Sequence, residues 1–254
     1  MKKAIATLVV GQAYLDTWTR ICRKGWRAYC ERHGYDLIVL DKALDTTPRA
    51  AARSPSWQKC LLLSQDWAKA YDRVVWVDSD ILINPAAPSI VEGVPEDKIG
   101  ATDELRYPSP AERQAIIRAG MNPELGNAEL YHKNGGLLGG QKHIVQGGVL
   151  VLSPRHHRAL LEHVYYAYEG LSTDPYYEMR YLSHEIQKQP QQHWIEDRFN
   201  ALLIWLILAV NVRTGAQPSQ AELRYFAMEQ YLRNHFLHFA GNMALMPLLD
   251  FVGA

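Results

Sequence analysis

The chain has 254 residues, in which 27 Lys and Arg balance 27 Asp and Glu, so the formal net charge is zero. This balance excludes a protein whose whole surface attracts nucleic acid or anionic membrane, and any anionic partner must be bound at a local site. Apolar residues make up 48% and charged residues 21%, as in ordinary globular proteins, and the length suits one large α/β domain.

Strands and helices are predicted to alternate over the first 80 residues. An apolar strand over residues 4–10 ends at Gly11, and a helix over 14–33 ends at Gly34, a good helix stop. A second strand over 35–40 leads through a loop to a helix over 57–71, which Ser56 can cap. A buried strand over 74–77 follows. This β-α-β-α-β order predicts a parallel sheet with right-handed crossovers.

The second half of the chain is less regular. We expect strands over residues 99–102, 145–152 and 236–241, and helices over 111–119, 154–170 and about 201–210. Glu196 and Asp197 precede the last of these helices and are expected at its positive end. The glycine-rich stretch 134–140 lacks a preceding strand and a Lys-Ser/Thr pair, which excludes a nucleotide P-loop.

The sequence also indicates a cellular compartment. The first residues lead directly into a short strand and do not resemble a signal peptide. The apolar run 201–210 is shorter than the roughly 20 residues of a membrane span, so we expect a buried helix. Cys22, Cys30 and Cys60 lack metal-type spacing and predict free thiols in a reducing compartment. We expect a cytoplasmic enzyme, for which peripheral membrane association stays open.

The stretch Asp78-Ser79-Asp80 follows the buried strand at 74–77 directly. Ligands of open α/β folds bind at the carboxyl ends of the strands, which is where these two carboxylates are expected. Two close carboxylates repel each other and are most easily kept ionised by a divalent cation such as Mg²⁺ or Mn²⁺. The alternative is an ordinary turn, since Asp and Ser are common turn residues. The buried strand before the pair favours a cation site.

Several motifs then occur in an order that resembles a known family. They are Ser56-Trp57-Gln58-Lys59, Trp76-Val77-Asp78-Ser79-Asp80, Gln146-Gly147-Gly148-Val149, Glu196-Asp197-Arg198-Phe199-Asn200 and His238-Phe239-Ala240-Gly241. Together they resemble nucleotide-sugar glycosyltransferases of the GT-A fold, most closely the galactomannan- and xyloglucan-type α-galactosyl- and α-xylosyltransferases. The glycogenin and lipopolysaccharide galactosyltransferase group is a more distant likeness.

This resemblance implies a fold and a division of the chain. It implies an α/β, Rossmann-like GT-A fold with a mixed, mostly parallel central sheet flanked by helices, in a single domain over residues 1–254. Residues 1–100 would form the nucleotide-sugar-binding half. Residues 101–254 would form the acceptor half and the C-terminal segment that supplies a metal ligand.

The resemblance also implies a metal site. Asp80 would bind Mn²⁺ or Mg²⁺ directly, and Asp78 would bind the metal or the donor ribose. His238 matches the histidine that completes the metal shell, and a nitrogen ligand favours Mn²⁺ over Ca²⁺. The alternative is that His238 is an ordinary core or surface histidine.

Further residues are expected at the donor. By position they are Val10, Gly11 and Tyr14 for the nucleoside, Asp41 for the base or ribose, Lys59 for the phosphate or sugar, and Gly147 and Gly148 for close approach of the backbone. Tyr14 could instead pack on its helix, Lys59 could be solvated, and the glycines could serve sheet–helix packing. The glycogenin-like group has a Lys-Pro-Trp after the histidine, whereas residues 242–247 here contain no lysine. The charge of the leaving group is therefore left mainly to the metal.

The acids Glu196 and Asp197 are the candidate catalytic residues. In inverting relatives an acid at this place deprotonates the acceptor hydroxyl, so Asp197 could be a general base. In retaining relatives the equivalent acid positions the donor sugar, and retention is the expectation here. Helix N-terminal electrostatics is the alternative explanation for this acidic pair. Glu185 is a lesser candidate, for which we expect a structural role.

The expected activity is transfer of a hexose or pentose from a nucleoside-diphosphate sugar, most simply UDP-linked, to a hydroxyl of a saccharide or other glycan. A sugar nucleotidyltransferase would need a glycine- and arginine-rich loop after the first strand, which residues 11–14 do not supply. A non-catalytic nucleotide-sugar or carbohydrate-binding relative stays open. The variable segments 106–140 and 171–192 are the expected acceptor surfaces.

Overall fold

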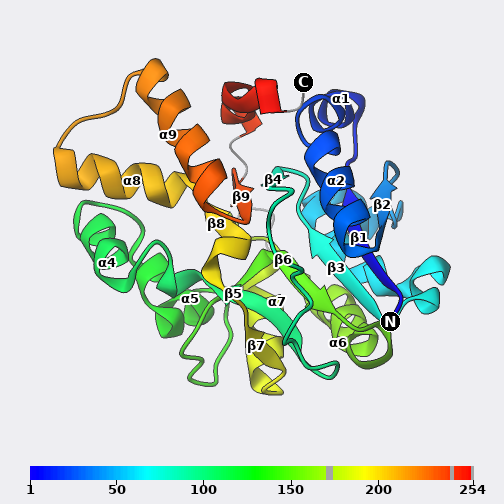
Figure 1. Cartoon of the computed structure of the whole chain (residues 1–254). Coiled ribbons are helices and arrows are strands. Elements are labelled where there is room, and N and C mark those ends of the chain that lie inside the picture. Colours follow the sequence, from blue (N-terminus) through cyan, green and yellow to red (C-terminus); the bar gives the residue numbers. More distant parts are fainter. Residues whose placement is uncertain (170–173, 241–242, 253–254) are drawn as a thin grey trace.

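The computed structural model describes residues 1–169, 174–240 and 243–252, arranged around a six-stranded sheet (Figure 1). The strand order is β2-β1-β3-β6-β5-β7. The bounds are β1 Lys3–Leu8, β2 Tyr35–Leu40, β3 Arg73–Val77, β5 Ile99–Asp103, β6 Val145–Leu152 and β7 Gln192–Trp194. β6 runs antiparallel to β3 and β5, whereas β1–β2, β1–β3 and β5–β7 are parallel pairs. The expected mixed, mostly parallel α/β sheet is confirmed.

Helices cover both faces of this sheet (Figure 1). The α-helices are α1 Gln12–Ile21, α2 Arg23–His33, α3 Pro48–Ala51, α4 Pro110–Arg118, α5 Ala128–Asn134, α6 Pro154–Ala167, α7 Met179–Lys188, α8 Leu203–Thr214 and α9 Gln220–Arg233. The 3₁₀ helices are η1 Pro55–Ser64, η2 Asp66–Ala70, η3 Glu104–Arg106, η4 Pro123–Gly126, η5 Asp197–Asn200 and η6 Met243–Val252. One hydrophobic core lies beneath α1, α2 and α8, and a second beneath η1, α6 and α7.

A second, three-stranded sheet joins distant parts of the chain. It has the order β4-β9-β8, with β4 Ile81–Ile83, β9 Phe236–His238 and β8 Ala201–Leu202. β4 and β9 are antiparallel and place His238 opposite Ile81, while β8 and β9 are parallel and place His238 beside Leu202. β4 begins directly after Asp80, so this small sheet brings the last strand to the predicted cation site.

The helix predicted over residues 14–33 is two helices, which meet at Cys22. The change of direction keeps Trp18 and Trp26 in the core, where their rings pack edge to face with centroids 5.5 Å apart. Trp26 Nε1 also donates a hydrogen bond to the carbonyl of Ile81 at 2.9 Å. The predicted stop at Gly34 is confirmed, because its φ of 68° is left-handed and glycine adopts it freely.

The helix predicted over residues 57–71 is wrong in type. The segment forms η1 and η2, and Ser54 caps η1 in place of Ser56. All residues from Trp57 to Leu63 are buried, because η1 packs between the sheet and α6. An α-helix with one exposed face cannot bury seven consecutive residues, so the burial of this segment does not fit an amphipathic α-helix.

The buried helix predicted over residues 201–210 is also wrong in part. Residues Ala201–Leu202 form β8, and α8 begins at Leu203 and buries only Leu203, Trp205 and Ala209. The helix projects with α9 as a hairpin away from the large sheet (Figure 1). Glu196 and Asp197 therefore do not open α8, because η5 and β8 lie between them and the helix. The positive N-terminal end of α8 therefore does not explain why this acidic pair is present.

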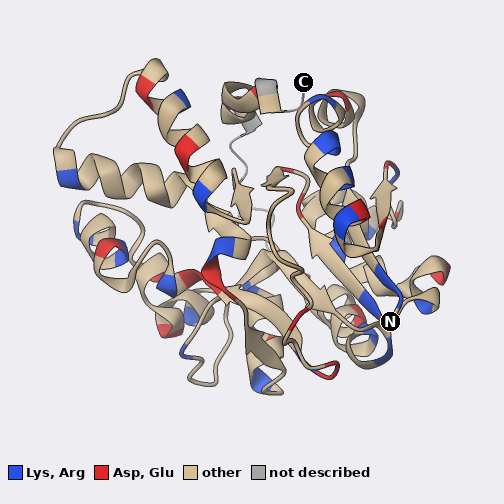
Figure 2. Ribbon diagram, viewed as in Figure 1, with Lys and Arg blue, Asp and Glu red and all other residues tan. Residues whose placement is uncertain are grey.

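Acidic and basic residues are interspersed over most of the ribbon, with a run of basic residues along α1 and α2 (Figure 2). Cys22, Cys30 and Cys60 are free, as the sequence predicted, and the structure shows that all three are buried. In the part of the chain that the structure describes, no helix has both the length and the apolar character needed to cross a membrane.

The buried His132 predicts a loss of stability in acid. Its Nδ1 contacts the Ala128 carbonyl at 2.7 Å and its Nε2 the Ser183 hydroxyl at 3.1 Å. Burial lowers the pKa of His132 to about 4, so the folded state excludes a proton that the unfolded state binds below its usual pKa near 6.5. Stability should therefore fall as the pH drops from about 6.5 to 4, by up to about 3 kcal/mol from this residue.

Urea unfolding at several pH values in this window checks the expectation. His132→Gln removes the titrating group and should flatten the pH dependence, whatever its effect on stability at pH 7. An equally steep loss in the variant would show that His132 does not contribute.

Candidate active site

A pocket of about 440 Å³ lies at the carboxyl ends of β1 and β3. Its lining is Leu8, Val10, Tyr14, Ser54, Pro55, Ser56, Trp76, Asp78, Ser79, Asp80 and Tyr177. Carboxyl ends of parallel strands are the ligand-binding edge of open α/β sheets. The pocket therefore brings together the predicted nucleoside residues Val10 and Tyr14 with both carboxylates.

The three predicted metal ligands converge beside this pocket. Asp78, Asp80 and His238 each offer a ligand atom, and these atoms lie within 4.8 Å of one another. His238 Nε2 lies 3.3 Å from Asp80 Oδ1. The Phe239 N–H donates to the Asp80 carbonyl at 3.0 Å, which ties the two segments together. Gly241, the last residue of the motif around His238, lies outside the described residues.

Asn200 orients His238. His238 Nδ1 lies 2.8 Å from Asn200 Oδ1, which can only accept, so Nδ1 carries a proton and the other ring nitrogen, Nε2, faces Asp80. Asn200 Nδ2 donates to Gln146 Oε1 at 2.9 Å, which fixes the amide. A neutral imidazole held by a hydrogen bond from its other nitrogen is the form that binds metals.

Gly148 leaves the space that His238 occupies. A Cβ on Gly148 would lie 2.4 Å from His238 Cε1 and 2.8 Å from Nδ1, whereas a Cβ on Gly147 would have only ordinary contacts of 3.7 Å or more. The Gly148 N–H also donates to Gln146 Oε1 at 2.5 Å. The close approach at Gly148 is therefore to the imidazole of the proposed metal shell.

Gly148→Ala and Gly147→Ala form a matched pair for testing this role. Gly148→Ala must displace His238 and should weaken Mn²⁺ binding by about 10- to 100-fold, the usual cost of disturbing the support of a metal ligand. Gly147→Ala adds the same methyl group one residue away and should bind Mn²⁺ like the parent. Calorimetric titration with Mn²⁺ measures both, and equal affinities would contradict the assigned role of Gly148.

Lys59 is buried between two carboxylates. Its side chain is 4% exposed, and Nζ lies 3.1 Å from Asp78 Oδ1, 2.8 Å from Glu178 Oε1 and 3.1 Å from the Gly147 carbonyl. Burial by itself would lower the pKa of Lys59, but Asp78 and Glu178 raise it above its usual value. All three N–H groups of the ammonium have partners in the protein, so in this arrangement Lys59 positions Asp78.

Asp78 is held from three sides. Besides Lys59, Trp76 Nε1 donates to Asp78 Oδ1 at 2.7 Å, and the Asp78 N–H donates to the Gly148 carbonyl at 2.8 Å. Burial raises the pKa of Asp78, Lys59 opposes this shift, and Asp80 adds to it. The carboxylate is therefore fixed in direction while remaining 27% exposed toward the pocket.

The other donor residues lie at different distances from this centre. Gly11, with a φ of 101°, precedes α1 and starts the turn that carries Tyr14 to the pocket. Tyr14 is 53% exposed, which leaves its ring free for a ligand rather than for helix packing. Asp41, after β2, is exposed and is not among the residues that line the pocket.

The predicted catalytic acids lie in different surroundings. Glu196 is 48% exposed on its side chain and accepts hydrogen bonds from Arg198 and from His235 at 3.2 Å. Asp197 faces Arg106 at 3.5 Å, while its Oδ1 is buried without a hydrogen-bond partner among the described residues. Burial raises the pKa of Asp197. Neither acid lines the 440 Å³ pocket.

Glu185 is buried on α7, where its Oε1 accepts a hydrogen bond from the Tyr168 hydroxyl at 2.6 Å. It lies outside the pocket lining as well. Four residues of the site had no predicted role: Gln146, Asn200, Tyr177 and Glu178. Gln146 and Asn200 stand inside the quoted motifs, and only their polar character there could have indicated them. Residues 170–173, which include the predicted end of one helix and the start of an acceptor segment, lie outside the described residues.

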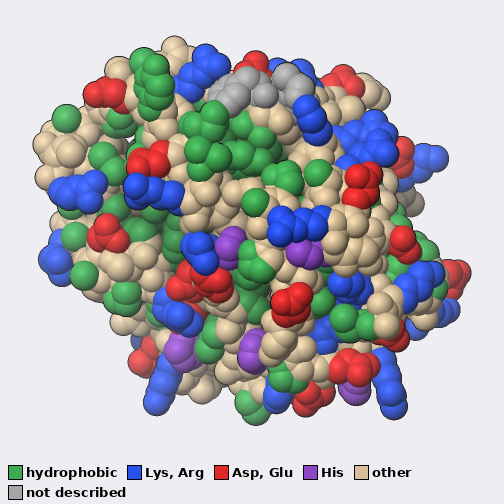
Figure 3. All heavy atoms as spheres, in the orientation of Figure 1, with side chains coloured by type: hydrophobic (Ala, Val, Ile, Leu, Met, Phe, Trp, Pro, Cys, Tyr) green, Lys and Arg blue, Asp and Glu red, His purple; other side chains and the backbone are tan. Residues whose placement is uncertain are grey.

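Two larger hollows lie along the α8–α9 hairpin. One of about 620 Å³ is lined by residues of both helices, and one of about 800 Å³ lies between α9 and η6. Figure 3 shows hydrophobic side chains gathered on this side of the molecule. Neither hollow is lined by Asp78, Asp80 or His238. Among these three, the pocket of about 440 Å³ is therefore the one that candidate metal ligands line.

No protein-family model matches the sequence, and no curated protein matches it either. Solved structures do. A glycosyltransferase involved in glycosylation of the major capsid of PBCV-1 matches with a TM-score of 0.58 at 13% identity, over 98% of this chain and all (100%) of that chain. The galactosyltransferase LgtC, in complex with donor and acceptor sugar analogs, matches with a TM-score of 0.51 at 13% identity, over 99% and 95%.

The bifunctional glycosyltransferase WbbM also matches, with a TM-score of 0.54 at 12% identity, over 95% of this chain and 46% of that one. At these identities the likeness concerns the backbone, and it agrees with the sheet order and with the fold that the motif order predicted. The chain therefore has the GT-A fold of nucleotide-sugar glycosyltransferases.

Proposed function

We propose that the protein is a metal-dependent glycosyltransferase that moves a hexose or pentose from a UDP-linked sugar to a hydroxyl of a glycan acceptor, with retention. One observation carries this proposal: Asp78, Asp80 and His238 converge within 4.8 Å at a pocket that Val10 and Tyr14 also line. That pocket unites a divalent-cation site with an exposed aromatic ring at the carboxyl edge of the sheet. A nucleoside diphosphate needs both features.

The donor set fits Mn²⁺ or Mg²⁺ in charge and in chemistry. The Lys59 ammonium contacts the carboxylates of Asp78 and Glu178, and Asp80 adds a third carboxylate beside them, so a divalent cation would balance the excess negative charge. His238 adds a nitrogen ligand, which favours Mn²⁺. When bound, the cation would act as a Lewis acid on the departing diphosphate.

The chain's own residues orient the reactants. Asp78 and Asp80 would hold the cation that binds the diphosphate, and Tyr14 offers its ring to the base. Lys59 and Trp76 keep Asp78 aimed at the pocket, and Asn200 keeps Nε2 of His238 directed at Asp80. Preorganised groups of this kind stabilise the charge that develops on the leaving group without reorganising during the reaction.

The role of Asp197 decides between two stereochemical outcomes. Asp197 has a raised pKa, and its Oδ1 is buried with no hydrogen-bond partner in the described part of the chain, which suits the general base of an inverting transferase. Arg106 at 3.5 Å holds the same carboxylate, which suits a positioning role in a retaining enzyme. We propose retention with Asp197 as a positioning acid. Glu196 then supports this turn through Arg198 and His235.

The remaining parts of the proposal concern the division of the chain and its setting. Residues 1–100 supply the nucleotide side of the pocket, and residues 101–254 supply Tyr177, His238 and the acceptor surfaces. Asp41 stays a proposed contact of the base or ribose. The free cysteines support a cytoplasmic setting.

Turnover of a panel of UDP- and GDP-sugars with and without Mn²⁺ tests the activity. We expect slow Mn²⁺-dependent hydrolysis of one UDP-sugar, which glycan acceptors accelerate. Thermal-shift measurements with UDP plus Mn²⁺ separate the alternatives: stabilisation without turnover of any donor would favour a non-catalytic binding relative. The absence of both would refute the proposal. NMR of the product's anomeric proton distinguishes retention from inversion.

A further inference from the structure

Tyr177 lines the proposed donor pocket together with Tyr14 and Asp78, although no motif singles it out. It lies in the turn before α7 and is 42% exposed. Its φ is 48°, in the left-handed region that non-glycine residues rarely adopt. A strained backbone conformation of this kind persists only where the surrounding contacts hold it.

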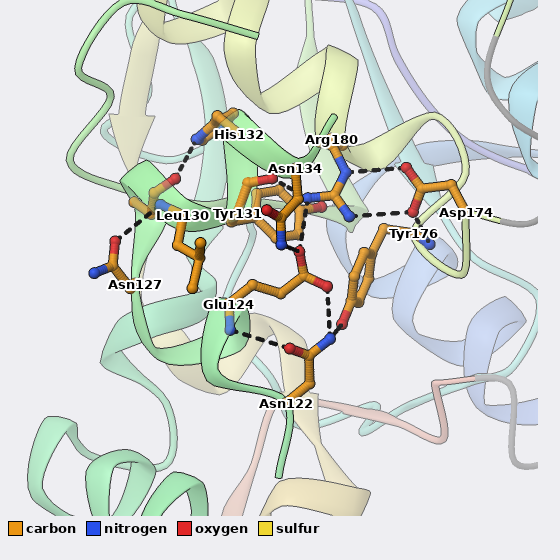
Figure 4. Close-up of polar contacts among 11 residues, drawn as sticks. Asn122, Glu124, Asn127, Leu130, Tyr131, His132, Asn134, Asp174, Tyr176 and Arg180 are labelled. Atoms are coloured by element: carbon orange, nitrogen blue, oxygen red, sulfur yellow. Dashed lines mark hydrogen bonds and ion pairs between the residues drawn. The ribbon is translucent and has the colours of Figure 1, made fainter. Parts of the chain in front are cut away.

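Arg180 and its partners hold the chain around this turn. Arg180 Nε lies 2.9 Å from Asp174 Oδ2 and Nη2 lies 3.2 Å from Oδ1, while Nη1 lies 3.1 Å from Glu124 Oε2. Figure 4 shows the guanidinium of Arg180 between Asp174 and Glu124, with Tyr176 beside them. The Tyr176 hydroxyl accepts a hydrogen bond from Asn122 Nδ2 at 3.2 Å. The guanidinium of Arg180 lies over the Tyr176 ring, with its Cζ 4.9 Å from the ring centroid.

Glu178 holds the other neighbour of Tyr177. Its side chain is 4% exposed, and its Oε1 lies 2.8 Å from Lys59 Nζ. The residues before and after Tyr177 are thus anchored by contacts to Arg180, Asn122 and Lys59. Tyr177 could relax its backbone only by breaking buried ion pairs, so the surroundings over-determine the strained conformation.

The strand order indicates the end of the pocket at which Tyr177 lies. Tyr14 follows β1, the two carboxylates follow β3, and β6 is the next strand in the order β1-β3-β6. Lys59 bridges Asp78 to the Gly147 carbonyl of β6, and Glu178 binds this bridge. Tyr177, adjacent to Glu178, therefore lies toward β6. In the proposed function the nucleoside would lie over β1 and the diphosphate over β3, so the sugar of the donor would extend toward β6.

We propose that Tyr177 packs its ring against the transferred sugar and helps to determine which sugar the pocket accepts; this inference rests on the proposed function. A tyrosine ring covers the C–H face of a sugar, and its hydroxyl can bond a sugar hydroxyl at the same time. Few, well-placed groups of this type set specificity in small-molecule pockets. The rigid turn also favours binding of the sugar, because a ring that is already ordered loses little entropy when the ligand binds.

Calorimetry of Tyr177→Ala with Mn²⁺ plus UDP, and with Mn²⁺ plus UDP-galactose, UDP-glucose and UDP-xylose, tests the proposal. For the sugar that the parent binds best, affinity should fall by about tenfold, whereas the affinity for UDP should change by less than about twofold. The preference among the three sugars should narrow. Tyr177→Phe keeps the ring and should retain most of the affinity.

Two further variants control for folding and for loss of any tyrosine. Tyr177→Gly relieves the left-handed strain, so its Tm should be no lower than that of Tyr177→Ala while the loss of sugar affinity is the same. Tyr225→Ala removes a ring that is 80% exposed on α9 and should bind every probe like the parent.

An equal loss for UDP and for UDP-sugars would place Tyr177 at the nucleoside and overturn the inference, as would unchanged affinity for all sugars. A parent protein that binds neither UDP nor any UDP-sugar with Mn²⁺ would refute the proposed function itself. The two failures are distinguishable, because the first appears only in the variants.

Discussion

Asp80→Asn is expected to lower Mn²⁺-dependent turnover of a UDP-sugar by at least about 100-fold, or roughly 3 kcal/mol of transition-state stabilisation. Asp80 is buried at 8% exposure and lies 3.3 Å from His238 Nε2, so its carboxylate is central to the proposed ligand set. The amide keeps the shape of the side chain but removes one of the two anionic ligands at the pocket. Turnover at saturating donor, with Mn²⁺ varied, measures the loss.

The fold should survive this substitution. Removing one carboxylate relieves repulsion with Asp78 while losing the contact to His238, so the Tm without metal should change little. Stabilisation by Mn²⁺ plus UDP should disappear in the variant. Asp66→Asn is a matched control, since the Asp66 side chain is 96% exposed and pairs with Lys69, three residues along the chain. Full activity of Asp80→Asn would overturn the assigned metal site.

Lys59→Met is expected to cost about 3–5 kcal/mol of unfolding free energy, the largest effect on stability that we predict. Removing the ammonium leaves Asp78 and Glu178 facing each other without their shared cation, next to Asp80. The methionine fills the volume of the lysine stem, so the loss reports charge rather than a cavity. Urea unfolding at pH 7 without metal measures it.

The double variant Lys59→Met/Glu178→Gln provides the control. It removes one of the two stranded carboxylates and should recover part of the lost stability, because the remaining repulsion is between Asp78 and Asp80. Mn²⁺ should also stabilise Lys59→Met more than the parent, since the cation supplies the missing positive charge. If Lys59→Met unfolds at the same urea concentration as the parent, the buried ion pair contributes nothing.

The sequence was most informative where local patterns alone decide structure. Residues 74–77 are apolar without interruption, which predicts a strand buried on both faces, and β3 is buried throughout. Gly34 predicts the end of α2, because helices commonly end at a left-handed residue and glycine adopts that conformation freely. Periodicity was least reliable at η1, where burial on all sides removes the amphipathic pattern that distinguishes an α-helix.

The sequence predicted the residues of the site better than it predicted the contacts between them. Asp78, Asp80 and His238 could be chosen from residue type and motif order. Lys59 was expected at a phosphate or sugar, whereas the structure pairs it with Asp78 and Glu178. Glu178 and Tyr177 gave no signal, because a turn before a helix carries no periodicity and their partners are distant in the chain.

By itself, the sequence determined the Asp-x-Asp at the end of a buried strand, since a strand's apolar run and the acids after it are local features. Only the tertiary structure decided what surrounds those acids. β4 pairs with β9 so that His238 lies opposite Ile81, and β8 pairs with β9 so that Asn200 reaches the imidazole. These short strands have almost no local signal, because their stability comes from pairing with distant chain segments rather than from their own residues.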